Sequence, residues 1–475
     1  MIVILKQYQQ RFLKAVCLLF QKNTGETDEE RRCNRRIHDA TLSTLVMTIS
    51  RLVNISMGLL TIPLTIHYLG EELFGAWMVL TSFVGILSFY DFGIGVGLRN
   101  ELIKCYASEN RELAGQYVFN ALVTLIFLAF ILIVLAFCIS PFLPLDKLIK
   151  CSNPETAKQV AYSATAMVII FALGLPLNQI LNICSAYQKA YIGYFFMLVG
   201  RILAFLFILL CVWCKWPFII LASGYLLLPS LLLIIAYVLY RRRNPWLFPL
   251  KEHLKWKLQK RLFSTGGYVM IHHLSYAMIY SSIILIIGNV IGAIPAGQYS
   301  IIQKLFSVTT IMGTSLLMGI SLPLGEAWHK REIPWIRKTL RQTWKVIGVT
   351  CILPLIAVIP MTGFLIKYWT GKENMIPSSA LVLACALVVG ISLLGDIYAN
   401  SLMAMDYVKI IALTRFCSGV LTLLGGYYIG KYTTSITILI FWQFLIGVLI
   451  PAIIFFCNMD RILKKAHSPS TETAG

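Results

Sequence analysis

Residues 217–240 read PFIILASGYLLLPSLLLIIAYVLY, a run without a charged side chain, and three arginines follow it directly at 241–243. The run before it, at 193–214, reads GYFFMLVGRILAFLFILLCVWC and carries one charge, on Arg201. A helix needs roughly 20 mostly apolar residues to cross about 30 Å of hydrocarbon. These two runs therefore predict two membrane-spanning helices.

The composition extends this interpretation to the whole chain. Of its 475 residues, 58% are hydrophobic and 13% are charged, and the mean hydropathy is +0.76. A soluble domain carries about 25% charged residues, so most of this surface must face lipid. The alternating segments of a β-barrel are absent from the sequence. We predict an all-α polytopic membrane protein with twelve spans, at 42–66, 75–98, 117–140, 159–182, 193–214, 217–240, 267–291, 298–324, 344–366, 378–403, 409–430 and 435–457.

The predicted spans fall into two groups of six. In chain order, we expect a basic N-terminal segment 1–40, a first lobe 41–240, a basic linker 241–266, a second lobe 267–457 and a tail 458–475. The spacing Gly-x4-Gly-x-aromatic occurs after the first span, at 70–77, and again after the seventh, at 292–299. Two similar lobes around a site at the membrane midplane are a recurrent transporter plan.

Lysine and arginine are distributed unevenly between the two sides of the predicted membrane. The formal net charge is +20, but it lies mainly between the apolar runs, so we expect no nucleic-acid partner. The N-terminal segment, the linker and the tail carry clusters of bases, which the positive-inside rule places in the cytoplasm together with both termini. The first 20 residues are basic and amphipathic, and they predict an interfacial helix. The opposite side carries only Lys147, Lys150, Lys158, Lys215, Lys367, Lys372 and Lys431.

The sequence contains no motif for catalysis. HExxH, GxSxG and Walker A motifs are absent, and the longest predicted external loop, about 141–158, has only Asp146 and Glu155 as acids. Most cysteines lie in apolar runs, where free cysteine behaves as a small hydrophobe. Cys211 and Cys214 form a CxxC without a second pair of metal ligands. We therefore expect no enzymatic activity, no cofactor and no metal.

Six ionisable residues lie inside the predicted spans: Arg51, Asp91, Arg201, Lys304, Asp396 and Arg415. A charge there must face the interior of the bundle or a hydrated cavity. Arg51 and Asp91 lie at similar depth in adjacent spans, and so do Asp396 and Arg415, so each pair can join for helix packing or gating. Arg201 and Lys304 have no acid at their depth in a neighbouring span. Because a buried cation favours an anionic partner, we predict that these two bases contact substrate.

Polar side chains follow one helix face in spans one, two, seven and eight, at steps of three or four residues. Such stripes either serve helix packing or line a hydrated cavity. Because they recur in spans related by the repeat, we expect a hydrated cavity between the lobes. Four bases against two acids would make this cavity cationic and suited to a phosphate or pyrophosphate. His272, near the inner end of span seven, is a candidate for proton coupling, although a histidine there is more often simply hydrogen-bonded.

The run at 68–104, YLGEELFGAWMVLTSFVGILSFYDFGIGVGLRNELIK, is followed by GQYVFNA at 115–121 and AYQKAYIGYFF at 186–196. Together with the 292–299 element, these segments resemble the bacterial polysaccharide (O-antigen type) flippases of the multidrug, oligosaccharidyl-lipid and polysaccharide exporter superfamily. The resemblance covers about residues 40–460. It implies two six-helix lobes in a V shape, related by a pseudo-twofold axis, and transport by alternating access.

The resemblance also implies a substrate, an undecaprenyl-pyrophosphate-linked oligosaccharide carried from the inner to the outer leaflet of the bacterial inner membrane for O-antigen, capsule or exopolysaccharide assembly. Other implied partners are membrane lipids, the glycan polymerase and chain-length machinery, and H+ or Na+ as coupling ion. Two alternatives stay open. A cation-coupled multidrug exporter of the same superfamily would favour an acidic cavity, and a membrane glycan polymerase or ligase would need a large external loop. The positions here that could hold the pyrophosphate are Arg51, Arg201, Lys304 and Arg415.

Overall fold

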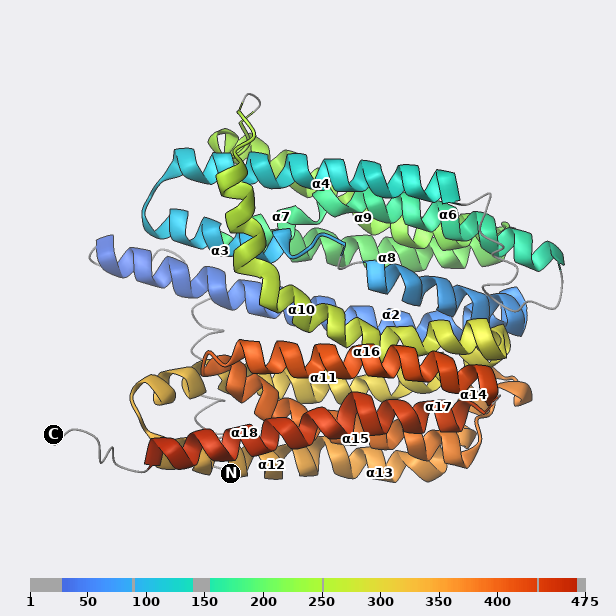
Figure 1. Cartoon of the computed structure of the whole chain (residues 1–475). Helices are drawn as coiled ribbons and strands as arrows, with labels where there is room; N and C mark the ends of the chain where they lie inside the picture. The colour runs from blue at the N-terminus through green and yellow to red at the C-terminus, as the bar shows by residue number, and fades with distance from the viewer. Residues whose placement is uncertain (1–27, 88–89, 140–153, 250–251, 434, 468–475) are drawn as a thin grey trace. The chain divides into compact units, whose positions relative to one another are not determined.

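The computed structural model describes residues 28–87, 90–139, 154–249, 252–433 and 435–467, and these ranges contain helices but no strand (Figure 1). The predicted N-terminal interfacial helix and most of the loop 141–158 lie outside the described residues. The α-helices are α2 (Asp28–Leu87), α3 (Ile94–Ala107), α4 (Arg111–Ile139), α6 (Pro154–Leu177), α7 (Gln179–Ala186), α8 (Ala190–Cys214), α9 (Phe218–Arg243), α10 (Trp256–Ile286), α11 (Ala293–His329), α12 (Ile333–Ile347), α13 (Leu353–Val358), α14 (Thr362–Thr370), α15 (Ser379–Ala404), α16 (Val408–Tyr432), α17 (Ile436–Trp442) and α18 (Ile450–His467). Shorter 3-10 and π segments are η1 (Pro245–Leu247), η2 (Ile287–Ile291), η3 (Gly348–Ile352), η4 (Ile359–Met361), η5 (Glu373–Met375) and η6 (Gln443–Leu449).

The predicted number of spans agrees with the helices. Within the described ranges, 11 helices are long and apolar enough to cross a membrane. One of them, Thr41–Leu87 in α2, contains the first predicted span and most of the second, with Gly70 (φ 76°, ψ 171°) turning the chain between them. Counting the two arms of α2 separately gives the twelve predicted spans. The prediction of an all-α, polytopic membrane protein is confirmed.

The chain divides into two compact units. Unit 1 comprises Met1–Thr61, Asp91–Ile139 and Thr165–Gly266, and unit 2 comprises Ile62–Tyr90, Ser140–Ala164 and Gly267–Gly475. Three of the borders fall inside α2, α6 and α10, so each of these helices contributes to both units. The described part of the linker 241–266 belongs to unit 1. The lobe borders expected from the sequence stay predictions.

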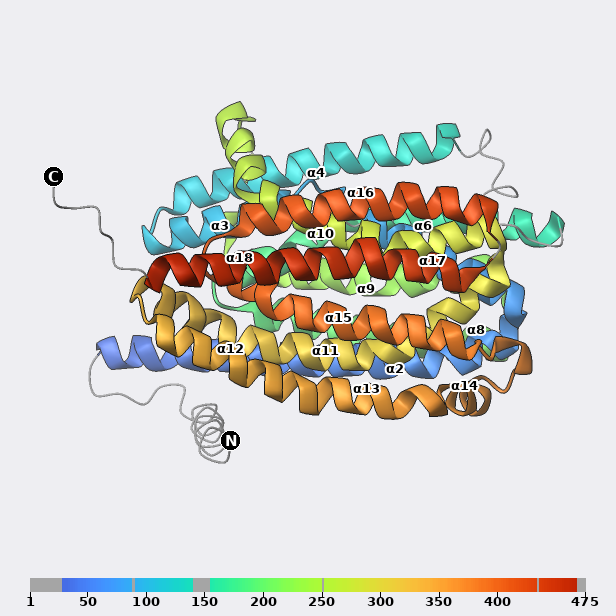
Figure 2. The same cartoon turned by 60° about the horizontal axis from the view of Figure 1, so that its bottom comes forward.

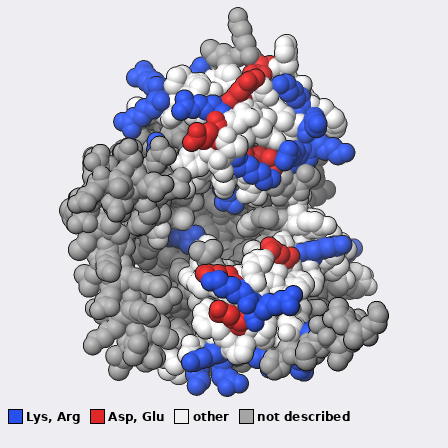
Figure 3. All heavy atoms as spheres, turned by 90° about the vertical axis from the view of Figure 1, so that its left-hand side faces the viewer, with Lys and Arg blue, Asp and Glu red and all other residues white. Residues whose placement is uncertain are grey.

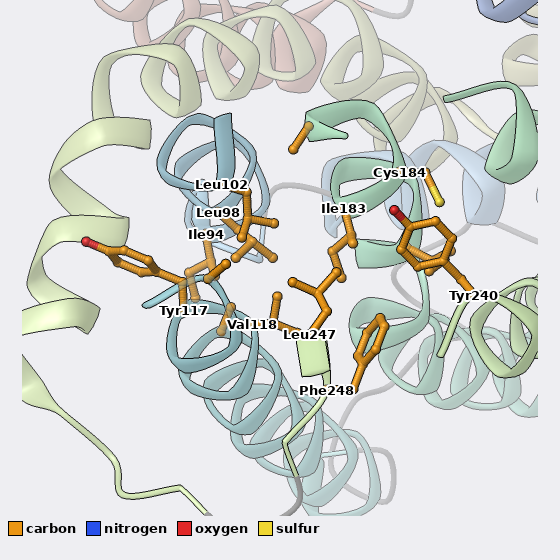
Figure 4. Close-up of a cluster of buried hydrophobic side chains, with 14 of the residues drawn as sticks. Ile94, Leu98, Leu102, Tyr117, Val118, Ile183, Cys184, Tyr240, Leu247 and Phe248 are labelled. Carbon is orange, nitrogen blue, oxygen red and sulfur yellow. The ribbon is translucent and has the colours of Figure 1, made fainter. Parts of the chain in front are cut away.

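The core of unit 1 gathers around one face of α3. Ile94, Leu98 and Leu102 repeat every four residues and are fully buried, as expected for the apolar stripe of a helix. Figure 4 shows them beside Tyr117 and Val118 of α4, with Leu247 and Phe248 following α9 in the same cluster. These contacts fix α3 against α4, and therefore fix the break that precedes α3.

A charged cluster at the far end of α3 ties it to the first turns of α10. The side chain of Glu101 is only 3% exposed; its Oε1 accepts a hydrogen bond from Lys104 Nζ at 2.6 Å, and Arg261 Nε lies 3.2 Å from Oε2. Burial raises the pKa of Glu101, but the two bases and a hydrogen bond from Tyr117 outweigh it and hold the pKa below its ordinary value. Glu101 is therefore a carboxylate at neutral pH.

Unit 2 packs α11, α12, α15 and α18 around a second core. Leu324 of α11, Ile336 of α12, Ile397 of α15 and Phe455 of α18 are all buried in it. In α12 the buried positions Ile333, Ile336, Leu340 and Ile347 share one face, whereas the bases Arg337, Lys338, Arg341 and Lys345 lie between them. This helix is therefore amphipathic, with one face against the core.

The two Gly-x4-Gly-x-aromatic elements found in the sequence contact each other in unit 2. Each begins at a glycine with a left-handed backbone, Gly70 (φ 76°) and Gly292 (φ 147°), which L side chains rarely adopt. A Cβ atom on Gly75 would overlap the carbonyl oxygen of Ala293, and one on Gly297 would lie 3.3 Å from the Cα atom of Gly75. The second glycine of each element thus lets two helix starts approach backbone to backbone.

We expect Gly75→Ala to lower the stability of the protein, because the new methyl group meets backbone atoms that cannot rotate away. Overpacking of this kind costs about 1–3 kcal/mol, which thermal unfolding in detergent would detect as a lower Tm. Gly319→Ala is the matched control, since a Cβ atom at Gly319 meets nothing within 4 Å. Equal Tm values for both variants would contradict the close contact at Gly75.

We expect Glu101→Gln to lower the Tm at neutral pH, by the equivalent of about 1–2 kcal/mol, because the variant loses charge-assisted bonds to bases that are themselves 58% exposed. The folded-state pKa of Glu101 lies below its ordinary value. Its ion pairs therefore contribute fully above the unfolded pKa of about 4.3, and the contribution disappears as pH falls through the folded-state pKa. The Tm difference between wild type and variant should shrink on acidification; a difference independent of pH would refute this account.

Candidate functional site

Arg201 lies in unit 1, about half-way along α8. It follows Ala190, where α8 begins, by eleven residues, or about 17 Å of helix. A Cβ atom on the preceding Gly200 would lie 2.7 Å from the Cα atom of Pro229, so α8 and α9 are in very close contact at this level. The guanidinium carbon of Arg201 is 5.9 Å from the ring centre of Tyr225 on α9. Tight packing of the hairpin and the tyrosine ring therefore hold the arginine at mid-span.

One donor of Arg201 has no protein partner. In the part of the chain that the structure describes, its Nε atom is buried without a hydrogen-bond acceptor, and no carboxylate lies within 4.0 Å of the side chain. A buried donor left unsatisfied costs about 1–3 kcal/mol, and more when it is charged. Such a donor favours any ligand that brings an acceptor or a negative charge to it.

Lys304 lies in unit 2, eleven residues after Ala293 begins α11. Its side chain is exposed within that unit, and no carboxylate of the described residues lies within 4.0 Å. An ammonium group facing lipid at mid-membrane is costly, so this position requires a hydrated or protein-lined environment.

Asp396 and Arg415 form an ion pair between α15 and α16. The Arg415 guanidinium donates to Asp396 Oδ1, and the side chains of Arg415 and Asp396 are 12% and 13% exposed, respectively. Phe455 lies 5.5 Å from the guanidinium carbon of Arg415. The contact expected from their equal depth is thus present, and it balances the charge of Arg415 locally.

A small cavity of about 20 Å³ adjoins this pair, with room for a single water molecule. Ser392 and two tyrosines of α10, Tyr276 and Tyr280, line it together with the ion pair. The tyrosine rings pack against each other in a tilted arrangement, with their centres 4.3 Å apart. Sequence reasoning missed these tyrosines, although their four-residue spacing, which continues the step from His272, places them on one face of the same helix.

His272 precedes Tyr276 by one turn of α10. Its ring centre is 5.5 Å from that of His273. Its Nδ1 atom is buried and has no hydrogen-bond partner among the described residues. The role in proton coupling stays a prediction.

Asp91 caps a helix that begins inside the second predicted span. The chain breaks at Phe92 (φ 50°) and Gly93 (φ 76°) before α3 starts. Asp91 accepts hydrogen bonds from the backbone N–H groups of Gly93 and Gly95, at 3.0 and 3.3 Å. A carboxylate is favourable at a helix N-terminus. Arg51 is exposed on α2, and its pairing with Asp91 stays a prediction.

Many hydroxyls of the predicted polar stripes bond to their own helices. Thr61 donates to the carbonyl of Met57 at 2.6 Å, Ser275 to Ile271 at 2.5 Å and Ser307 to Lys304 at 2.6 Å. This local bonding is the ordinary behaviour of serine and threonine in membrane helices. The stripes alone therefore do not establish a hydrated cavity, and the charged residues are the stronger candidates for a site.

Solved structures with the same fold are known. A multidrug resistance MATE family transporter of the MOP superfamily, in an inward-facing conformation, has a TM-score of 0.73 at 13% identity, covering 91% of this chain and 100% of that one. A MOP superfamily transporter from Pyrococcus furiosus gives 0.65 at 14% identity, covering 91% and 97%. The lipid II flippase MurJ, in an inward closed conformation, gives 0.66 at 12% identity, covering 89% and 90%. At these identities the likeness establishes the fold alone.

The comparison with family models identifies the family of the chain, which the structural comparison does not. No curated protein matches the chain significantly. Residues 41–326, more than half of the chain, match the family described as polysaccharide biosynthesis protein. The resemblance seen in the sequence is thereby confirmed. This chain belongs to the polysaccharide biosynthesis protein family.

Proposed function

We propose that the chain carries an undecaprenyl-pyrophosphate-linked oligosaccharide across the cytoplasmic membrane, from the inner to the outer leaflet, by alternating access. The observation that carries this proposal is Arg201, a mid-span base whose buried Nε atom lacks a partner in the described structure. A pyrophosphate brings several acceptor oxygens and negative charge, and bonds between guanidinium and phosphate are among the strongest that proteins form. Membership of the polysaccharide biosynthesis family supports a glycan as the cargo.

Lys304 provides a second mid-span cation, in unit 2. An ammonium group is a compact charge with three donors and no fixed orientation. It can therefore stay with a head group whose orientation changes, whereas the planar guanidinium of Arg201 selects one geometry. The predicted contribution of Arg415 is secondary in this proposal, because Asp396 already neutralises Arg415. The contribution of Arg51 stays a prediction.

The proposed orientation follows from the distribution of bases. Figure 3 looks onto the end of unit 1 that carries the turn between α3 and α4, and there the blue of Lys and Arg covers more of the described surface of this unit than the red of Asp and Glu. The bases of this end include Lys104 of α3 and Arg241–Arg243 of α9. Positively charged ends are retained in the cytoplasm. We therefore assign this end, and both termini, to the cytoplasm of a bacterial cell.

A cation-coupled multidrug exporter is less compatible with the carboxylates of the spans. A cationic drug needs an available acid, but Asp396 is paired with Arg415, and Asp91 caps α3. A drug-susceptibility panel separates the two functions, since an exporter predicts greater sensitivity in a deletion strain and a flippase does not.

Deletion of the gene should abolish the surface glycan that this transporter serves and cause its lipid-linked repeat units to accumulate inside the cell. The measurement is glycan on the cell surface and lipid-linked intermediates in membrane extracts, with a plasmid copy as the control. Normal surface glycan in a strain without a second flippase would exclude the proposed function.

We expect Arg201→Ala to reduce transport at least about 10-fold, since one charge-assisted hydrogen bond is worth about 1.5–3 kcal/mol. Arg201→Lys should restore part of the loss, because it keeps the charge but loses the planar geometry. Arg242→Ala is the matched control, as Arg242 is exposed at the end of α9 in the same unit. Transport is measured as surface glycan per molecule of membrane-inserted protein, and wild-type values for Arg201→Ala would remove this residue from the site.

A further inference from the structure

The first turns of α10 carry exposed aromatic side chains that the transport proposal does not use. Trp256 is 75% exposed and Phe263 36% exposed, and Leu254, just before the helix, is 54% exposed. Trp256, Lys260 and Phe263 follow the spacing i, i+4, i+7, so they lie on one face of the helix. An exposed tryptophan between lysines is unusual on a surface that faces only water.

The opposite face of this segment is held firmly in unit 1. Asn120 Oδ1 of α4 accepts a hydrogen bond from the backbone N–H of Lys255 at 2.8 Å, and Gln259 Nε2 donates to Thr124 Oγ1 at 3.1 Å. Leu262 is 1% exposed, and its carbonyl oxygen occupies the space that a Cβ atom on Gly97 would need. Together with the bond from Arg261 to Glu101, these contacts fix the rotation of the helix. The exposure of Trp256 and Phe263 is therefore a consequence of specific packing.

The exposed face borders a row of unbalanced positive charge. Residues 252–263 contain one acid, Glu252, and four bases, Lys255, Lys257, Lys260 and Arg261. Arg261 is engaged by Glu101. Lys257 and Lys260 are exposed, and no carboxylate in the described ranges lies within 4.0 Å of either. The surface thus combines apolar rings with two ammonium groups that lack a counter-ion.

The segment lies close to the end of a membrane span. The apolar run Met270–Ile291 begins seven residues after Phe263, a distance of about 10 Å along a helix. Figures 1 and 2 both show the first turns of α10 crossing the direction of α4 in unit 1 instead of running along it. A helix that crosses the spans next to the start of one of them lies near the level of the lipid head groups.

We propose that the face formed by Trp256, Lys257, Lys260 and Phe263 is a binding site for anionic phospholipid. Tryptophan is favoured at the boundary between head groups and hydrocarbon, and an amphipathic helix lies in that boundary with lysines beside its apolar face. The rings enter the acyl region, and the two ammonium groups bind the phosphates of negatively charged lipids. The linker is thereby held on the membrane surface, a property separate from the choice of cargo.

The test counts lipids bound to the purified full-length chain by native mass spectrometry, with phosphatidylglycerol, phosphatidylcholine or glycerol phosphate added. We expect phosphatidylglycerol to bind more tightly than phosphatidylcholine, and glycerol phosphate to compete poorly because it lacks acyl chains. Lys257→Gln combined with Lys260→Gln should weaken phosphatidylglycerol binding roughly 30-fold, since each lysine near an anionic surface contributes about a factor of five. Arginine at both positions should restore binding.

Two controls separate this site from general effects of charge and of exposed tryptophan. Lys464→Gln combined with Lys465→Gln removes the same charge from α18 and should leave phosphatidylglycerol binding unchanged. Trp256→Ala should weaken binding several-fold, whereas Trp213→Ala should not, although Trp213 is 82% exposed at the end of α8. Each variant is first shown to keep the wild-type Tm. Equal binding by the Lys257 and Lys260 double variant and wild type, or no preference for phosphatidylglycerol, would overturn the proposal.

Discussion

In hydrocarbon no water is available to an unpaired N–H or C=O group, so each span must satisfy its backbone internally. The break before α3 shows how a departure from regular helix is compensated. Where the chain breaks at Phe92 and Gly93, the carboxylate of Asp91 accepts from two of the freed N–H groups. At the π segment η6, the fully buried amide of Gln443 donates to the carbonyl of Ile279 and accepts from the hydroxyl of Tyr299. Tyr299, the aromatic residue of the second Gly-x4-Gly-x-aromatic element, is therefore also a hydrogen-bond donor to the irregular span that contains η6.

The same constraint distinguishes the mid-span charges from one another. Asp396 and Arg415 satisfy each other, and a pair of this kind holds two helices together without any ligand. Arg201 has only a tyrosine ring beside its guanidinium and an Nε atom without an acceptor in the described chain. Burying this charge costs free energy in the protein without substrate. An anion that pairs with the charge recovers this free energy, which then contributes to the binding of the anion. This difference, more than the number of bases, makes Arg201 a better candidate for substrate contact than Arg415.

Apolar length was sufficient to predict the number of spans, because the bilayer imposes one length scale on every helix. It did not predict the break at Phe92 and Gly93, which interrupts the predicted span 75–98. The distance of each charged residue from the end of its span also predicted that Asp396 lies beside Arg415. Equal distances from the same membrane surface put two residues of neighbouring antiparallel helices at the same depth. The hydroxyl stripes were less informative: the donors of Thr61, Ser275 and Ser307 bond to their own helices, which the spacing alone could not reveal. The partners of Glu101 were also hidden, because Arg261 is distant in sequence and arrives only when the linker packs on α4.

The two units also differ in the contacts that hold their helices together. This difference affects where a movement of helices costs less free energy. The linker is joined to α3 and α4 by ion pairs and directed hydrogen bonds, whose loss would leave polar groups unsatisfied near the membrane. The contact of Gly75 with Ala293 and Gly297 is different, because it consists of backbone surfaces in van der Waals contact. In lipid such contacts have no hydrophobic driving force and are held by van der Waals packing. A conformational change would therefore cost less at the glycine contact than at the linker, and an anchored linker is compatible with a transporter whose glycine-packed helices separate.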